Sequence, residues 1–187
     1  EIVPVGDDQK QHIELARDLA ARFNARFGAD TFVLPEPAIQ RETARIYDLQ
    51  NPTSKMSKSG ETPAGILWLL DEPSVTAKKI MRAVTDTDGE VRFDREHKPG
   101  VSNLLTIFSV LSGRTIADIE QEFAGRGYGD FKKALAEVVV SVFEPIRART
   151  LELLDDPAEL DRLLGINADR ASKVAEATLA TVYDRIG

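Results

Sequence analysis

The sequence contains no cysteine and only two histidines, His12 and His97, in 187 residues. Without thiols the chain can form neither disulfide bonds nor cysteine-ligated zinc sites, which agrees with a reducing compartment. Two imidazoles also argue against a metal site built mainly from histidine. We therefore expect a cytoplasmic protein whose own side chains hold no structural metal ion.

Long apolar stretches are missing as well. The longest runs, residues 66–70 and the segment around residues 138–140, fall far short of the ~20 apolar residues that a membrane-spanning helix needs. The first residues, Glu1-Ile2-Val3, show neither the basic start nor the long apolar core of a secretory signal. We expect no membrane partner.

Positive charge is in the minority, because 24 Lys and Arg residues face 31 Asp and Glu residues and the formal charge is −7. Overall charge therefore argues against indiscriminate binding of nucleic acid, although a local basic surface can still meet RNA. Hydrophobic and charged residues make up 42% and 29% of the chain, as in folded globular proteins. The length suffices for one domain, or for two small units that share an interface.

The first third of the chain has an α/β pattern. Residues 1–5 are apolar at alternate positions and predict a short buried strand. After the turn at Gly6, residues 9–27 carry apolar side chains at helical spacing. Asp7 and Asp8 stand where a helix cap and its first turn favour carboxylates. Strand, turn and helix form half of a βαβ unit.

The next segments are turns and loops. Gly28 is expected to end the first helix, and residues 31–34 are expected to be extended. Residues 41–50 have no clear pattern, whereas residues 51–54 predict a turn, followed by a polar exposed loop through Gly60. This part of the sequence thus predicts irregular structure between the α/β part and the C-terminal two thirds of the chain.

Helices dominate the remainder, without internal repeats or a long linker. The expected ranges are 74–84 capped by Ser74, 101–111, 115–123 with a Thr-x-x-Asp start, 130–154, a short helix from Asp156 or Pro157 to about Gly165, and 169–186. The fold class is therefore α/β at the start, followed by an all-helical region.

The most specific feature is the segment Lys55-Met56-Ser57-Lys58-Ser59. Two ammonium groups with nearby backbone and hydroxyl donors can surround a polyphosphate. When a carboxylate attacks an α-phosphate, such lysines stabilise the negative charge that builds on the departing pyrophosphate. Met56 can lie flat against an apolar base such as adenine. From composition alone, a solvated surface loop is the commoner explanation.

This five-residue string is identical to the second signature motif of the class I aminoacyl-tRNA synthetases. Other parts of the chain resemble the bacterial tryptophanyl branch of that family, in the right order and from Glu1 to near the C-terminus. These parts are residues 3–12 with a Gly-x-Asp-Gln segment, 83–86, 98–105 and 127–132. The tyrosyl branch shares the general plan and is the alternative within the class.

The resemblance implies a fold and a division of the chain. Residues 1–60 would be the C-terminal part of a Rossmann-like catalytic domain with the signature loop. Residues 61–187 would be an α-helical anticodon-binding region, whose final helix could return to the catalytic domain. No His-Ile-Gly-His-type first signature occurs in the sequence. We therefore expect a C-terminal fragment that lacks the N-terminal half and is inactive by itself.

The resemblance also implies roles for individual residues. Lys55 and Lys58 would be catalytic, and Gln9 would reach the amino-acid substrate. The implied ATP-binding residues are Gly6, Asp7, Asp8, Ile46, Lys55, Met56, Ser57, Lys58 and Ser59. Without the resemblance, Asp7 or Asp8 would be an ordinary helix cap. His12 is expected to be hydrogen-bonded to a neighbour, because an ionised carboxylate needs no base, and His97 is expected at the surface or in a turn.

The implied activity is ATP-dependent activation of L-tryptophan to tryptophanyl-AMP and its transfer to tRNA(Trp). Mg²⁺ would accompany the ATP phosphates, and the full-length protein would be a homodimer. The alternatives are a non-catalytic RNA-binding or dimerisation module derived from such an enzyme, and an unrelated helical domain. Three basic clusters, residues 78–82, 132–133 and 147–149, could meet RNA phosphates, but solvated helix faces are the commoner explanation.

Overall fold

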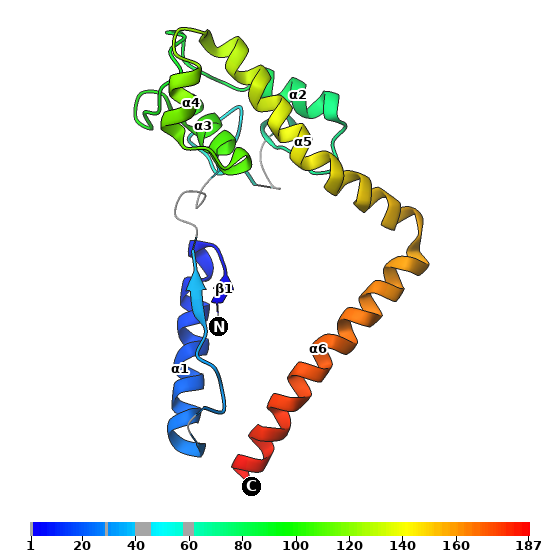
Figure 1. Ribbon diagram of the computed structural model, residues 1–187. Helices are drawn as coiled ribbons and strands as arrows, with labels where there is room; N and C mark the ends of the chain where they lie inside the picture. The colour runs from blue at the N-terminus through cyan, green and yellow to red at the C-terminus, as the bar shows by residue number, and fades with distance from the viewer. Residues whose placement is uncertain (1, 29, 40–45, 58–61) are drawn as a thin grey trace. The chain divides into compact units, whose positions relative to one another are not determined.

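The computed structural model describes residues 2–28, 30–39, 46–57 and 62–187, apart from the side chain of Asp7. The chain divides into two compact units (Figure 1). Unit 1 comprises residues 1–44 and 152–187, and unit 2 comprises residues 45–151. The predicted boundary between residues 60 and 61 separates functional regions and not compact units, and it stays a prediction.

Unit 1 begins with two parallel strands joined through a helix. The elements are β1 (Ile2–Pro4), the short 3-10 turn η1 (Asp7–Gln9), α1 (Lys10–Phe27) and β2 (Glu36–Ala38). β1 and β2 pair in parallel, with Val3 opposite Pro37, and Figure 1 shows them alongside α1. A strand, a helix and a parallel strand make one βαβ unit.

Two expectations for these strands were wrong. The extended piece predicted at residues 31–34 lies instead at β2, and Pro37 is part of it. Proline is tolerated there because the sheet has two strands among the described residues, so β2 has a partner on one side. β1 is not buried, since Ile2 is 72% exposed. A single neighbouring strand leaves much of its surface uncovered.

The end of α1 matches the sequence pattern. Gly28 adopts φ 136° and donates its N–H to the carbonyl of Asn24 at 3.2 Å. The side-chain amide of Asn24 also brackets Phe32, because its oxygen accepts the Phe32 N–H at 2.9 Å and its nitrogen donates to the Phe32 carbonyl at 2.8 Å. The chain after α1 is thereby fastened back to the helix.

The last element of unit 1 differs from the prediction of two helices. α6 (Pro157–Ile186) is one helix of 30 residues, and it runs through Gly165 without a break. Asp156 caps its start, accepting the Glu159 N–H at 3.1 Å, as the sequence indicated. A helix-interior glycine costs only about 1 kcal/mol relative to alanine. No proline follows Pro157 to stop the helix.

Unit 2 is helical. Its elements are the short 3-10 turn η3 (Pro63–Gly65), α2 (Pro73–Met81), α3 (Pro99–Ser112), α4 (Ile116–Glu122) and α5 (Gly127–Asp155). The four α-helices were predicted, but the cap assigned to Ser74 was wrong. α2 starts at Pro73, after Glu72 and without a side-chain cap, because proline at the first helical position has no N–H to satisfy.

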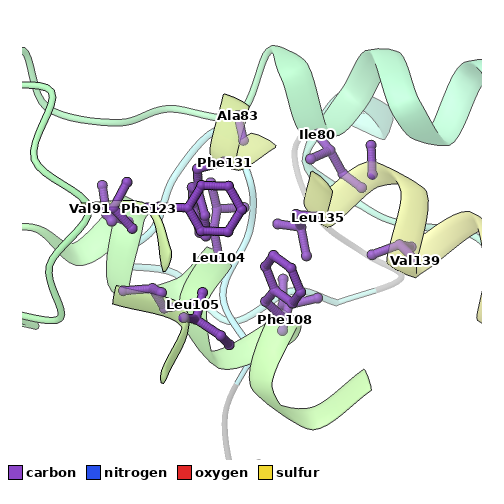
Figure 2. Packing of buried hydrophobic residues seen from close by; sticks show 14 of the residues in the cluster. Ile80, Ala83, Val91, Leu104, Leu105, Phe108, Phe123, Phe131, Leu135 and Val139 are labelled. Carbon is purple, nitrogen blue, oxygen red and sulfur yellow. The ribbon is translucent and has the colours of Figure 1, made fainter. Parts of the chain in front are cut away.

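The core of unit 2 is formed by apolar side chains from α2, α3, α4 and α5 (Figure 2). Phe108, Phe123 and Phe131 lie at its centre, with ring centroids 5.5–6.1 Å apart. Leu104 and Leu135 surround them and are fully buried. Aromatic rings at such distances add to the stabilisation from burial alone. The helices of unit 2 therefore form a rigid support for the segments attached to them.

Thr115→Ala is expected to destabilise unit 2 by about 1 kcal/mol. Thr115 caps α4 by accepting the Asp118 N–H at 3.2 Å, and alanine leaves that donor without its partner. Urea unfolding followed by the fluorescence of Trp68, the single tryptophan, measures the loss. Thr62→Ala is the matched control, because Thr62 precedes η3 without making a cap bond. Equal stabilities of the two variants would contradict the assignment.

Candidate functional site

The first half of the signature segment belongs to a β-hairpin, residues 46–56, which we call the signature hairpin. Tyr47 and Lys55 form an antiparallel bridge. The Met56 N–H donates to the Ile46 carbonyl at 2.9 Å, and the Asp48 N–H donates to the Ser54 carbonyl at 2.9 Å. The turn predicted at residues 51–54 closes this hairpin. Lys55 and Met56 therefore have a defined backbone conformation.

The side chains of the signature hairpin point to different surroundings. Lys55 is exposed, so its ammonium group is available to a ligand. Ile46 and Met56 are partly buried and pack against the core of unit 2, and Ser57 is half-buried. Lys58 and Ser59 lie outside the described residues. The binding roles predicted for these residues stay predictions.

Asp48 and Gly65 support the turn of the signature hairpin, and sequence reasoning missed both. The buried carboxylate of Asp48 accepts the N–H groups of Gln50 at 2.7 Å and Asn51 at 3.0 Å. A Cβ atom at Gly65 would lie 2.0 Å from each oxygen of that carboxylate. Only glycine fits so close an approach. The Asx turn was readable from Asp48 and Asn51, but the distant glycine was not.

The Gly6–Gln9 turn lies in unit 1. The Gln9 N–H donates to the Gly6 carbonyl at 3.0 Å, which turns the chain into α1. A Cβ atom at Gly6 would come within 2.7 Å of the Asp8 carboxylate. Gln9 donates to Asp8 at 3.2 Å and its carbonyl oxygen lies 2.9 Å from His12 Nδ1. Asp8, Gln9 and His12 thus form a hydrogen-bonded row.

One prediction for this turn was wrong and two for histidines are confirmed. Gln9 rather than Asp7 or Asp8 precedes α1, and it makes no side-chain cap bond, because the two aspartates lie in the 3-10 turn before the helix. His12 is hydrogen-bonded to a neighbour, as expected. His97 is 73% exposed and pairs with Asp94 at 3.0 Å within a turn.

The three later segments that resemble the synthetases meet around one buried ammonium group, in what we call the Lys98 cluster. It consists of Lys98, Asp86, Asp88, Tyr128 and the carbonyl of Glu90. The Lys98 side chain is 2% exposed, and its ammonium donates to Asp86 at 3.3 Å, to Tyr128 at 3.2 Å, to the Glu90 carbonyl at 3.1 Å and to Asp88. Tyr128 in turn donates to Asp86 at 2.5 Å. The resemblance to the synthetases indicated the three segments, but not the hydrogen bonds between them.

The Lys98 cluster shifts the pKa values of its members. Burial acts to lower the pKa of Lys98, but the hydrogen bonds to Asp88, Tyr128 and Asp86 outweigh it and hold that pKa above its usual 10.5. The bond from Lys98 lowers the pKa of Asp88 below its usual 3.8. Burial, then the bond to Asp86, raises the pKa of Tyr128. Lys98 is therefore charged at neutral pH.

In each predicted basic cluster, one cation makes protein contacts. Lys79 donates to Asp71 at 2.5 Å, with its side chain 12% exposed. Lys132 is buried against backbone and hydroxyl oxygens, and burial lowers its pKa. Arg147 pairs with Glu72 and its side chain is 15% exposed. These three side chains bind within unit 2, whereas Lys78, Arg82 and Lys133 are exposed, and RNA contacts at the clusters stay a prediction.

The part of the chain that the structure covers lacks two other kinds of feature. Its His, Asp and Glu side chains nowhere gather in a group of three or more suited to a metal ion. None of the helices described there combines the length and the apolar character needed to cross a bilayer.

Comparisons with known proteins agree with the motifs. The chain is 66% identical over 187 residues to the tryptophan–tRNA ligase of Leifsonia xyli, covering 100% of this chain and 55% of that protein. The fold resembles the tryptophanyl-tRNA synthetase of Mycoplasma pneumoniae, with a TM-score of 0.80 and 36% identity over 100% of this chain and 57% of that one. It also resembles the tryptophanyl-tRNA synthetase of Campylobacter jejuni solved with ADP and tryptophan, with a TM-score of 0.66 and 33% identity over 100% of this chain and 57% of that one.

The chain thus spans about half the length of the curated relatives that it matches. The family described as tRNA synthetases class I (W and Y) matches residues 1–144. This match covers most of the chain and includes both the Gly6–Gln9 turn and the signature hairpin. The protein therefore belongs to the class I tRNA synthetases of the tryptophan and tyrosine group.

Proposed function

We propose that this chain is part of a tryptophan–tRNA ligase, which activates L-tryptophan with ATP and transfers it to tRNA(Trp). The observation that carries the proposal is the signature hairpin. It aligns Lys55 with Tyr47 and Met56 with Ile46, so a phosphate-binding cation stands beside the residues assigned to adenine. The curated relatives that the chain matches at 57–66% identity are tryptophan enzymes, which favours tryptophan over tyrosine.

The activation step needs charge stabilisation rather than a protein base. A carboxylate oxygen of tryptophan attacks the α-phosphorus of ATP, and the bond between that phosphorus and the bridging oxygen breaks, which releases pyrophosphate. Negative charge grows on the pyrophosphate as the bond breaks. In this proposal Lys55 and Lys58 stabilise that charge more strongly in the transition state than in the ground state.

Mg²⁺ enters this reaction with ATP. The described carboxylates and imidazoles form no three-membered group that could hold the ion by themselves, and Mg²⁺ commonly binds through substrate phosphates with few protein ligands. In this proposal the substrate is the magnesium complex of ATP. The role of this chain would be to contact the phosphates through lysine side chains and backbone groups.

Unit 1 carries the residues that the resemblance assigns to the ATP ribose and to tryptophan. The βαβ arrangement of β1, α1 and β2 supports a Rossmann-like fold, in which ligands bind where a strand leads into a helix. Gly6, Asp7 and Asp8 lie at that point and would contact the ATP ribose. Gln9 would reach tryptophan, and its amide is already oriented by Asp8 and His12.

The remaining assignments rest on membership of the family. The helical region would bind the anticodon stem and loop of tRNA(Trp), and the complete enzyme would be a homodimer. The negative charge of the chain means that RNA would have to meet a local surface rather than a general basic field.

Pyrophosphate exchange tests the proposal. The protein with its complete coding sequence is incubated with ATP, labelled pyrophosphate and either tryptophan or tyrosine. We expect exchange that depends on tryptophan, followed by charging of tRNA(Trp). Exchange with tyrosine alone would identify the tyrosyl alternative. An absence of exchange together with retained RNA binding would identify a non-catalytic module.

A further inference from the structure

A buried side-chain amide on α3 holds the backbone of the signature hairpin. Asn103 is 4% exposed. Its side-chain oxygen accepts the N–H of Tyr47 at 2.9 Å, and its nitrogen donates to the carbonyl of the same residue at 2.8 Å. Both main-chain polar groups of one residue are thus bound by one amide. Two such bonds fix both the position and the orientation of the Tyr47 backbone.

The helix that carries Asn103 is itself firmly held. Lys98, immediately before α3, is the buried cation of the Lys98 cluster. Gly100, in the first turn, approaches the carbonyl of Val84 so closely that a Cβ atom would lie 2.1 Å from it. Leu104 and Leu105 are completely buried in the core. The amide is therefore attached to a part of the molecule that has little freedom to move.

Tyr47 lies near the start of the signature hairpin, next to residues assigned to ATP. It follows Ile46, whose carbonyl accepts the N–H of Met56, and it lies opposite Lys55 in the antiparallel bridge. Fixing the backbone of Tyr47 therefore fixes three of the residues assigned to ATP. The segment leads directly into Ser57 and Lys58, so the clamp lies at the base of the signature segment.

We infer that Asn103 is a positioning residue for the signature segment, setting Ile46, Lys55 and Met56 in their places for the reaction with ATP. The inference rests on the proposed function. Asn103 itself would touch neither the nucleotide nor the amino acid. Its effect on the reaction comes through the backbone of Tyr47.

A neighbouring cavity explains why loss of the clamp would loosen the hairpin rather than unfold the unit. Tyr47 and Asn103 line this cavity together with Pro52, Arg95 and Thr106. Without the amide, water entering from the cavity can bind the N–H and the carbonyl of Tyr47. The core formed by Phe108, Phe123 and Phe131 does not depend on these two bonds.

The test compares Asn103→Ala with Asn24→Ala in the protein with its complete coding sequence. Asn24 makes the same two-bond clamp on the backbone of Phe32, so both variants lose an equivalent pair of hydrogen bonds. Active sites are counted from the burst of tryptophanyl-AMP, and pyrophosphate exchange is then expressed per site. We expect Asn103→Ala to lower kcat per site by about 10- to 100-fold and to raise KM for ATP, with KM for tryptophan unchanged. Asn24→Ala should leave all three values unchanged per site.

Asn103→Asp supplies a second variant of nearly equal size. It keeps an acceptor for the Tyr47 N–H but places a carboxylate oxygen against the Tyr47 carbonyl, so it should be impaired at least as strongly as Asn103→Ala. A purely structural role would reduce only the number of active sites, with kcat and KM per site as in the wild type, and that result would overturn the inference. If the wild type shows no exchange with tryptophan, the proposed function fails and the inference fails with it.

Discussion

Lys58→Ala slows tryptophan-dependent pyrophosphate exchange by roughly 10²- to 10³-fold, whereas tryptophan binding changes little. The expected loss is large because the ammonium group acts where charge develops in the transition state, as a preorganised donor does in other enzymes. That charge develops on the pyrophosphate and not on tryptophan, so the ground-state binding of tryptophan does not need the lysine. Exchange kinetics and equilibrium titration with tryptophan measure the two quantities separately.

The control for this substitution removes a lysine elsewhere. Lys173 is exposed on α6, and Lys173→Ala makes the same change in total charge. Its exchange rate should equal that of the wild type. The transition-state role of Lys58 would be refuted by an unchanged rate in Lys58→Ala. It would also be refuted if the whole loss were accounted for by weaker tryptophan binding.

Lys98→Met is expected to lower the free energy of unfolding of unit 2 by about 3 kcal/mol. The substitution removes the cation and leaves Asp86, Asp88 and the hydroxyl of Tyr128 facing one another. Breaking a buried ion pair from one side is strongly destabilising, since the remaining charges lose their partner. The expected loss lies at the low end of the range for broken buried ion pairs, because Asp88 is 56% exposed and water can reach it.

Urea unfolding followed by Trp68 fluorescence measures this effect, because the single tryptophan lies in unit 2. Lys133→Met is the matched control. Lys133 is exposed on α5, and its replacement should change the stability by no more than about 0.5 kcal/mol. If the two variants proved equally stable, the Lys98 cluster would contribute nothing to the fold.

The difference in free energy of unfolding between the wild type and Lys98→Met should depend on pH in strong acid and in strong base. The pKa of Asp88 is lowered on folding, so its contribution is present above 3.8 and is lost as the pH falls toward the lowered pKa. The pKa of Lys98 is raised, so its contribution is present below 10.5 and is lost as the pH rises through the raised value. The difference between the two proteins should therefore be constant from about pH 5 to 9 and shrink in acid. A constant difference down to the acid limit would contradict the pairing.

Local signals in the sequence predicted the local structure well. Gly28 ends α1 and Thr115 caps α4, because both positions depend on backbone geometry within one turn of the chain. The wrong predictions also came from local signals. The prediction that a helix ends near Gly165 is wrong, because a single glycine does not outweigh the helix formers on both sides in α6.

The contacts that support the candidate site could not be predicted in this way. Lys98 and Tyr128 are 30 residues apart, and Asn103 and Tyr47 are 56 apart. No periodicity or spacing rule relates such residues. The resemblance to the synthetases marked the segments that contain Lys98, Asn103 and Tyr128, but a motif says nothing about which side chains meet. Packing of the helices decides that.

The clamp between Asn103 and Tyr47 uses only main-chain atoms of Tyr47. Neither hydrogen bond therefore requires a particular side chain at position 47. A fluorinated or fluorescent amino acid introduced there would leave both hydrogen bonds in place. Position 47 thus offers a spectroscopic probe at the base of the signature segment, from which the arrival of a nucleotide can be followed in real time.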